Sequence, residues 1–293
     1  HKAAYTMAVF FFILRQINHF IIARFELPRY NTYMSNNNLL LDFQNQSNVL
    51  DGLNKAQLQA VTHKNGPLLI IAGAGTGKTS VITRRIAYII EQKWAKPSEI
   101  LALTFTEKAA SEMEERVDML VPYGYTDMWI STFHAFGDRF LRDYSLDLGL
   151  PANFNVLTAT EQAIFMRQHL FAFDLEYYRP IASPTTHINS LLSHFSRLKD
   201  ELISPQQYLI YVNEQLDKLT TDVDEDTIIE TKKRLELANA YQRYQELMIQ
   251  SGNLDYGDQI YLTHKLLSEN SNTLKNLQNT FKYILVDEFQ DTN

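Results

Sequence analysis

The sequence predicts an α/β fold in which a parallel sheet and its helices are interrupted by an all-helical segment. Two observations predict the sheet. From Leu53 onward, short apolar runs alternate with longer segments of helical period, and a glycine-rich turn follows the first apolar run. This alternation is typical of βαβ units around a parallel sheet. The third observation predicts the insertion, because amphipathic helical patterns replace the strand-like runs between about residues 150 and 250.

Each predicted element rests on a local pattern. Apolar runs predict four strands, at 68–72, 100–105, 128–132 and 283–286. Isoleucine and valine recur at helical spacing from Thr79 to Gln92, which predicts the first long helix. A second helix is expected from Glu107 to about Leu120, with its apolar side chains on one face. The insertion is expected to contain helices at 161–173, 206–219 and 228–249.

The expected organisation is an N-terminal extension at 1–48 followed by one domain at 49–293. Within that domain, the α/β core is expected at about 49–150 and 251–293, and the helical insertion at about 151–250. The apolar run Met7 to Leu14 is far shorter than the roughly 20 residues of a spanning helix, so we expect no membrane association. A polar stretch follows Met34, which predicts that the native chain starts there and that residues 1–33 are not native.

The composition limits the function classes that remain. The formal net charge is −7, which is the wrong sign for nucleic-acid binding by overall electrostatic attraction. Any contact with nucleic acid must therefore be local. The chain has no cysteine, which excludes disulfides and thiolate zinc sites. The phosphate-binding loop described next favours a cytoplasmic location.

The strongest local signal is a glycine-rich loop between the first strand and the first long helix. Its residues, with the serine that follows, are Ala72, Gly73, Ala74, Gly75, Thr76, Gly77, Lys78, Thr79 and Ser80. Glycines permit backbone conformations in which successive N–H groups converge on phosphate oxygens at a helix N-terminus. Lys78 is then expected to reach the β- and γ-phosphates of ATP, and the Thr79 hydroxyl to bind Mg²⁺. The alternative is a glycine-rich turn without chemistry, and a second motif argues against it.

That second motif is a pair of carboxylates at the end of the last predicted strand. Asp287 and Glu288 directly follow an apolar run, at the strand end where open α/β sheets bind their ligands. Asp287 is expected to hold Mg²⁺ through its water shell, and Glu288 to orient or deprotonate the attacking water. Alone, such a pair is more often a helix start. Beside a phosphate-binding loop, it is the expected partner.

A weaker signal lies just before the first strand. Gln57 belongs to a short amphipathic helical pattern, and its amide can form two hydrogen bonds with an edge of adenine, which would select ATP over GTP. An exposed glutamine on an ordinary helix is the alternative reading.

Together these motifs resemble superfamily 1 DNA helicases of the UvrD/Rep/PcrA group, over essentially all of 53–293. Five motifs in the family's order carry the resemblance. They are the Q motif and motifs I, Ia, Ib and II, at 53–61, 72–79, 103–117, 129–134 and 286–293. The segment Leu-Asp-Tyr-Gly-Asp at 254–258 also resembles one that these proteins carry before motif II. The resemblance implies a RecA-like P-loop NTPase domain with an inserted helical subdomain. It further implies an ATP-dependent 3'–5' translocase on single-stranded DNA, or on DNA with a 3' single-stranded tail, in a family associated with DNA repair.

The resemblance also implies site residues. Six residues of motifs Ia and Ib become candidates for contact with the DNA strand, namely Thr104, Phe105, Thr106, Thr132, Phe133 and His134. Stacking on an aromatic ring needs no particular base, which suits a motor that must pass any sequence. Core packing is the alternative for Phe105, and a hydrogen-bonded core position is the alternative for His134. Gln290 is implied to couple nucleotide to DNA, and it completes the catalytic set with Lys78, Asp287 and Glu288.

Two positions depart from the family's pattern. Glu107 stands where UvrD-like proteins usually have Asn, and Ser80 stands where several relatives place an Arg near the base. The glutamate is reminiscent of helicase subunits in AddA/RecB-type helicase-nuclease complexes, which remain an alternative. A non-catalytic nucleotide-binding or single-strand-binding relative is another. A P-loop GTPase is disfavoured, because no Asn-Lys-x-Asp element is present.

The family's remaining motifs, III to VI, lie in relatives beyond the position of Asn293, and they include arginines that reach the γ-phosphate from a second motor domain. Such an arginine is worth about 10³ to 10⁵ in rate. We therefore expect this chain to contain the first motor domain only, to bind Mg-ATP weakly and to hydrolyse it slowly at best.

Overall fold

The computed structural model describes residues 20–25, 49–73, 75–121, 128–218 and 224–289. These residues form two compact units. The helical unit contains Phe136–Glu269, and the α/β unit contains the described residues up to Ala135 and those from Asn270 onward. Within the described ranges, no helix is both long enough and apolar enough to cross a membrane.

A five-stranded parallel sheet organises the α/β unit, in the order β2-β1-β7-β3-β4. Its strands are β1 (Phe20–Phe25), β2 (Leu68–Ile71), β3 (Ile100–Thr104), β4 (Trp129–Thr132) and β7 (Tyr283–Val286). The α/β class and the four predicted strands are confirmed. Strands β3 and β7 are buried along their whole length, which explains why each reads as a continuous apolar run rather than an alternating one.

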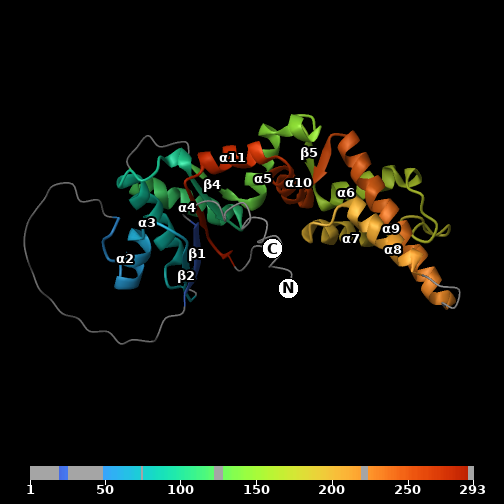
Figure 1. The fold of residues 1–293 in the computed structure, drawn as a ribbon, viewed down its shortest axis with the longest axis horizontal. Coiled ribbons are helices and arrows are strands. Elements are labelled where there is room, and N and C mark those ends of the chain that lie inside the picture. The colour runs from blue at the N-terminus through green and yellow to red at the C-terminus, as the bar shows by residue number, and fades with distance from the viewer. Residues whose placement is uncertain (1–19, 26–48, 74, 122–127, 219–223, 290–293) are drawn as a thin grey trace, which may run out of the picture. The chain divides into compact units, whose positions relative to one another are not determined.

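Strand β1 was not predicted, and it lies inside the sheet, between the edge strand β2 and the central strand β7 (Figure 1). Ile21 lies opposite Leu68 of β2 on one side and Leu285 of β7 on the other. The strand therefore separates the strand that precedes the glycine-rich loop from the strand that precedes the carboxylate pair. It falls within the segment 1–33. The proposed start at Met34 stays a prediction, but residues 20–25 have a defined place in the sheet.

Three helices share the core of the α/β unit with the sheet. They are α2 (Lys55–Thr62), α3 (Lys78–Glu91) and α4 (Glu107–Leu120), and the last two match the predicted helices. Among the side chains in this core are Ile70, Val81, Ile86, Ala102, Met113, Val117 and Leu285. The short helix α11 (Ser271–Thr280) leads into β7, and Phe281 packs its ring edge against Trp129 of β4, with centroids 5.3 Å apart.

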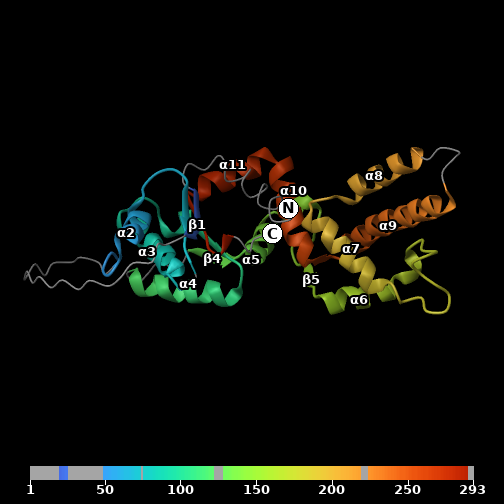
Figure 2. The ribbon, with the colours of Figure 1, turned by 90° about the horizontal axis from the view of Figure 1, so that it is seen from below.

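The helical unit contains more than the predicted insertion. Its helices are α5 (Phe133–Asp143, from Phe136 onward), α6 (Ala159–Gln168), α7 (Ile188–Asp200), α8 (Pro205–Asp217), α9 (Glu225–Gln250) and α10 (Tyr256–Glu269). Helices α8 and α9 lie side by side (Figure 2). The unit is wider than 151–250 because α5 packs on α10: a Cβ at Gly137 would lie 3.0 Å from the Gln259 carbonyl oxygen. Short 3₁₀ turns occur at Pro97–Glu99, Ser145–Leu148 and Leu170–Ala172.

Two expectations for the insertion were wrong. A two-stranded parallel ladder joins β5 (Asn155–Leu157) to β6 (Asn253–Asp255), although no strand was expected in this region. Helix α7 was also missed. Strands of three residues are too short to produce an alternating pattern, and their partners are distant in sequence, so the ladder left no local signal.

A buried charge cluster lies where α7, β6 and α10 meet. Lys199 Nζ lies 2.7 Å from Asp255 Oδ2 and 2.8 Å from Asp258 Oδ1, and all three side chains are nearly inaccessible to solvent. Tyr244 donates its hydroxyl hydrogen to Asp255 at 3.2 Å, and Gln245 donates an amide hydrogen to Asp258 at 2.9 Å. The cluster contains both aspartates of the segment 254–258, which therefore serves the internal structure of the helical unit.

Candidate nucleotide and DNA sites

The glycine-rich loop adopts the backbone that its sequence requires. Gly75 and Gly77 have φ angles of +75° and +86°, in the left-handed region that non-glycine residues adopt only at a cost. Gly77 is also the N-cap of α3, and a Cβ there would lie 3.5 Å from the Gln57 amide nitrogen. The loop thus delivers the positive end of α3 to the carboxyl edge of the sheet, which favours phosphate binding. Ala74 lies outside the described residues.

Side chains from the loop and from the end of β7 converge in front of α3. Lys78 Nζ lies 3.3 Å from Glu288 Oε2, and Thr79 Oγ1 donates to Asp287 Oδ2 at 3.1 Å. The partners in these two contacts are 210 and 208 positions apart in sequence, so only the sheet brings them together. This is the arrangement predicted for the nucleotide site, with a cation, a hydroxyl and two carboxylates in contact.

Asp287 is the more tightly held of the two carboxylates. It is only 2% exposed, and its backbone N–H donates to Leu103 O at 2.9 Å, which extends the ladder between β7 and β3. Burial raises the pKa of its carboxyl, while the hydrogen bond from Thr79 opposes that rise. A hydroxyl and a carboxylate oxygen at this spacing are hard donors of the kind that Mg²⁺ prefers. The pair Thr79 and Asp287 therefore fits a magnesium ion.

Glu288 stands in a strained backbone conformation, with a φ angle of +50°. Its backbone N–H donates to Asp287 Oδ1 at 3.0 Å, which helps to hold the turn after β7. Strained residues of this kind cluster at active sites, where the surrounding structure overcomes the cost. The turn aims the Glu288 carboxylate at Lys78, into the pocket described next.

A pocket of about 570 Å³ opens at this point, within the usual size range of small-molecule sites. It is lined by Gly75, Gly77, Lys78, Thr79, Ser80, Arg116 and Glu288. Arg116, on α4, was not predicted to line the site. Arg116 Nη2 lies 3.4 Å from Glu112 Oε2, one helical turn earlier. The packing of α4 against α3 brings Arg116 to the phosphate side.

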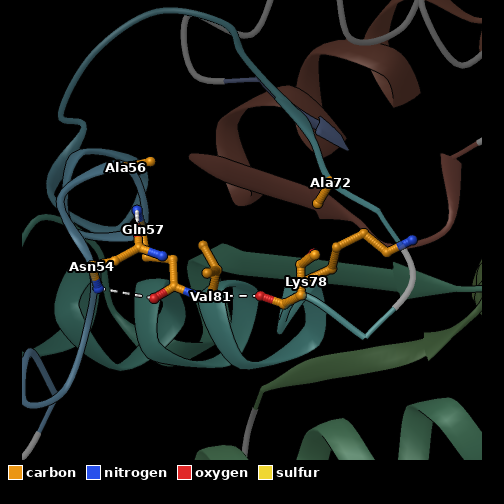
Figure 3. A pocket seen from close by; sticks show the side chains of 7 residues that line it. Asn54, Ala56, Gln57, Ala72, Lys78 and Val81 are labelled. Atoms are coloured by element: carbon orange, nitrogen blue, oxygen red, sulfur yellow. Dashed lines mark hydrogen bonds between the residues drawn. The ribbon is translucent and has the colours of Figure 1, made fainter. Parts of the chain in front are cut away.

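Gln57 reaches the glycine-rich loop from the other side (Figure 3). Its Oε1 accepts from the Asn54 backbone N–H at 3.0 Å, and its Nε2 donates to the Thr76 carbonyl at 3.2 Å. The amide keeps one N–H and one lone pair for the two-bond adenine contact. A small cavity of about 20 Å³ lies between this helix and the loop, and Ala72 and Val81 also line it.

The helix that carries Gln57 is tied to the helix that follows the loop. Arg85 of α3 is fully buried and donates to the carbonyls of Ala60 and Val61 at 2.9 and 3.1 Å. These carbonyls lie near the C-terminal end of α2, where the last carbonyls of a helix have no partner within the helix. Burial lowers the pKa of the Arg85 guanidinium to about 10. The interaction holds Gln57 in a constant position relative to the glycine-rich loop.

Two of the six predicted DNA contacts are buried in the structure. Thr104 is fully buried at the end of β3. Thr132 is 4% exposed, and its hydroxyl donates to Glu107 Oε1 at 2.7 Å while accepting from the Ala135 N–H at 3.1 Å. Both side chains are therefore closed to a DNA strand in this conformation. Sequence position alone could not distinguish a strand end from the exposed turn after it.

Of the other four candidates, Phe105 and Thr106 lie in the turn after β3, and Phe133 and His134 are the first residues of α5, directly after β4. Phe105 is 51% exposed, so the core-packing alternative does not hold for it. Thr106 and His134 are exposed, and Phe133 is partly exposed. The ends of β3 and β4 are neighbours, since Thr104 pairs with Thr132, and these side chains therefore lie along one edge of the sheet. Gln290 lies outside the described residues.

Comparison with known proteins agrees with this geometry. A model of the UvrD/REP helicase N-terminal domain matches residues 53–293. The ATP-dependent DNA helicase PcrA of Bacillus subtilis is 37% identical over 245 residues, which cover 84% of this chain and 30% of that protein. The ATP-dependent DNA helicase UvrD1 of Mycobacterium tuberculosis is 38% identical over 248 residues, 84% of this chain and 29% of the relative. A probable DNA helicase II homolog of Rickettsia conorii is 38% identical over 253 residues, 85% and 35% of the respective lengths. The chain thus spans about a third of the length of these relatives.

Proposed function

The chain belongs to the UvrD/REP helicase family, and from this premise we propose that it is the ATP-binding first motor domain of an enzyme that moves 3' to 5' along single-stranded DNA. The observation that carries the proposal is the pocket lined by Lys78, Thr79 and Glu288, with Asp287 hydrogen-bonded to Thr79 at its edge. ATP-dependent motors of this kind need a second motor domain, and we propose that a complete enzyme supplies one.

The residues of the pocket divide the chemistry of ATP hydrolysis between them. Lys78 can exchange its contact with Glu288 for a phosphate oxygen, which leaves the Glu288 carboxylate available to orient the attacking water. Thr79 and Asp287 would hold Mg²⁺, which supplies positive charge next to the phosphates. Gln57 would contact the adenine edge with the one N–H and the one oxygen lone pair that its hydrogen bonds to Asn54 and Thr76 do not use.

Arg116 adds a second cation to the pocket, and we assign it to the phosphates. A guanidinium can form two parallel hydrogen bonds to a phosphate group. Its present partner Glu112 also lies within 4.0 Å of Lys108, so Glu112 keeps a cation when Arg116 turns toward the pocket. The arginine would therefore be available for the nucleotide without leaving a carboxylate unpaired.

The proposed DNA path follows the turn after β3 and the start of α5. Phe105 offers an exposed ring on which a base of any identity can stack. Thr106 is exposed, and although its hydroxyl accepts from the Ala109 N–H at 3.1 Å, its hydrogen can still be donated to a phosphate. Phe133 and His134 continue the path at the start of α5. Because the chain is acidic overall, we expect few phosphate contacts and a modest salt dependence.

The nucleotide half of the proposal is tested by titrating the 293-residue chain with a fluorescent ATP analogue in the presence of Mg²⁺. Lys78→Ala should remove most of the binding, whereas Lys275→Ala, which removes an exposed lysine of α11 in the same unit, should leave it unchanged. Equal binding by Lys78→Ala and the wild type would refute the site. Turnover should be slow. DNA-stimulated hydrolysis that depends on Lys78 would show instead that this chain completes a working site without a separate second domain.

The DNA half is tested by fluorescence anisotropy with a labelled oligothymidine. Phe105→Ala should weaken binding by about five- to 150-fold, which corresponds to the roughly 1–3 kcal/mol of one stacked base. Met119→Ala is the matched control, because this side chain is 83% exposed at the other end of α4 and lies off the path. A Phe105→Ala variant that binds as tightly as the control would exclude the proposed path.

A further inference from the structure

A chain of two hydrogen bonds connects the start of α4 to the first turn of α5. The Ala135 backbone N–H donates to Thr132 Oγ1 at 3.1 Å, and Thr132 Oγ1 donates to Glu107 Oε1 at 2.7 Å. Thr132 is buried, so its hydroxyl is satisfied on both sides without water. The carboxylate of Glu107 is therefore the fixed point to which the start of α5 is attached.

The position of Glu107 in its helix reinforces this attachment. It is the first residue of α4, directly after the N-cap Thr106. A carboxylate in the first turn of a helix interacts favourably with the exposed backbone N–H groups and with the helix dipole. These are also the groups that make a helix N-terminus attractive to phosphate. Glu107 thus places its own negative charge where a DNA phosphate would otherwise be favoured.

The surroundings of Glu107 are those of the proposed DNA path. The residue is exposed, and it lies two positions after the exposed ring of Phe105. A strand whose base stacks on Phe105 carries a phosphate on each side of that nucleotide. Through about 4 Å of water, two like charges repel by about 1 kcal/mol. This corresponds to about fivefold in affinity.

We propose that Glu107 is a positioning residue of the DNA path that also limits the affinity for single-stranded DNA. It orders the first turn of α5 through Thr132, and its charge keeps the DNA strand weakly held at this place. A motor that must release the strand at each step needs such weak contacts. The inference rests on the proposed DNA function. The hydrogen bond of Glu107 to Thr132 should support DNA binding, whereas the charge of the same side chain should weaken it.

The two effects are separated by comparing Glu107→Gln with Glu107→Ala in the 293-residue chain. Glutamine keeps an oxygen that accepts from Thr132 and removes the charge, whereas alanine removes both. Glu115→Gln is the matched control: it removes the same charge from an exposed position on the same helix, about 12 Å further along the axis. Oligothymidine binding is measured by anisotropy at about 0.05 M and about 1 M salt, where charge effects are respectively strong and screened.

The expected result is that Glu107→Gln binds about fivefold more tightly than wild type at low salt, and equally at high salt. Glu115→Gln should match the wild type at both. Glu107→Ala should bind more weakly than Glu107→Gln, because the first turn of α5 loses its attachment. A Glu107→Gln variant that binds no more tightly than wild type at low salt overturns the inference and leaves the DNA path intact. If wild type and Glu115→Gln bind no DNA, the proposed path fails and the inference fails with it.

Discussion

Replacing Lys199 with methionine tests whether the buried charge cluster holds the helical unit together. Methionine preserves most of the volume of the side chain but leaves Asp255 and Asp258 facing each other without the cation that now lies within 2.8 Å of both. Removing one partner of a buried ion pair costs about 3–5 kcal/mol. Because the lysine has two carboxylate partners, we expect a loss toward the upper end of that range.

The pH dependence of this loss follows from the pKa values of the cluster. Burial and the charge of Asp255 raise the pKa of Asp258 to about 6, above the value of about 3.9 for an unfolded aspartate. The contribution of Asp258 to stability is therefore full below about pH 4 and is lost as the pH rises through about 6. Burial also pushes the pKa of Asp255 upward, but the charge of Lys199 holds it below the usual value. Without Lys199, both carboxyls take up protons more readily, so the variant should lose less stability at pH 5.5 than at pH 8.

Urea unfolding with two probes isolates the unit concerned. Both tryptophans, Trp94 and Trp129, belong to the α/β unit, so their fluorescence should be unaffected by Lys199→Met. Hydrogen exchange in α7, α9 and α10 should reveal the loss. The exposed lysine Lys232 on α9 provides the control variant Lys232→Met. A loss below about 1 kcal/mol, or one that does not change with pH, would refute this account of the cluster.

Three further predictions concern the α/β unit. Gly77→Ala should destabilise this unit by about 1–2 kcal/mol, because Gly77 has a φ of +86°. The variant should also bind an ATP analogue more weakly. If both unfolding and binding are unchanged, the left-handed conformation at Gly77 is not required. Arg116→Ala should weaken the binding of ATP more than that of AMP in a calorimetric titration, and equal losses would place Arg116 outside the phosphate site. A chain that starts at Met34 lacks β1 from its place between β2 and β7, so its tryptophan fluorescence should report unfolding at lower urea. An unchanged midpoint would show that the sheet does not need this strand.

The nucleotide site could be predicted from the sequence because its chemistry is local to two short motifs. The loop from Ala72 to Thr79 needs glycines at special φ angles and a lysine at a helix start, and few other sequences satisfy those demands. The carboxylates Asp287 and Glu288 follow a fully buried strand, which reads as an unmistakable apolar run. Such features depend on neighbours in sequence, so the sequence displays them directly.

The DNA path was harder to predict, because exposure is not a local property. Thr104 and Phe105 are adjacent in sequence, yet the first is fully buried and the second is 51% exposed. Strand β3 ends at Thr104, so the Thr104 side chain remains inside the sheet, and Phe105 belongs to the turn that follows. The motif marked the right turn, but the division into buried and accessible side chains came from the packing of β3 against its neighbours.

By itself, the sequence determined the α/β class, the four strands and two long helices around the glycine-rich loop, and the residue types that can bind a nucleotide. Only the tertiary structure decided that β1 lies between β2 and β7, that Arg116 lines the phosphate pocket, and that Glu107 binds Thr132. The physical reason is the same in each case. These arrangements depend on contacts between segments remote in the chain, and periodicity and local propensity carry no information about which segments become neighbours.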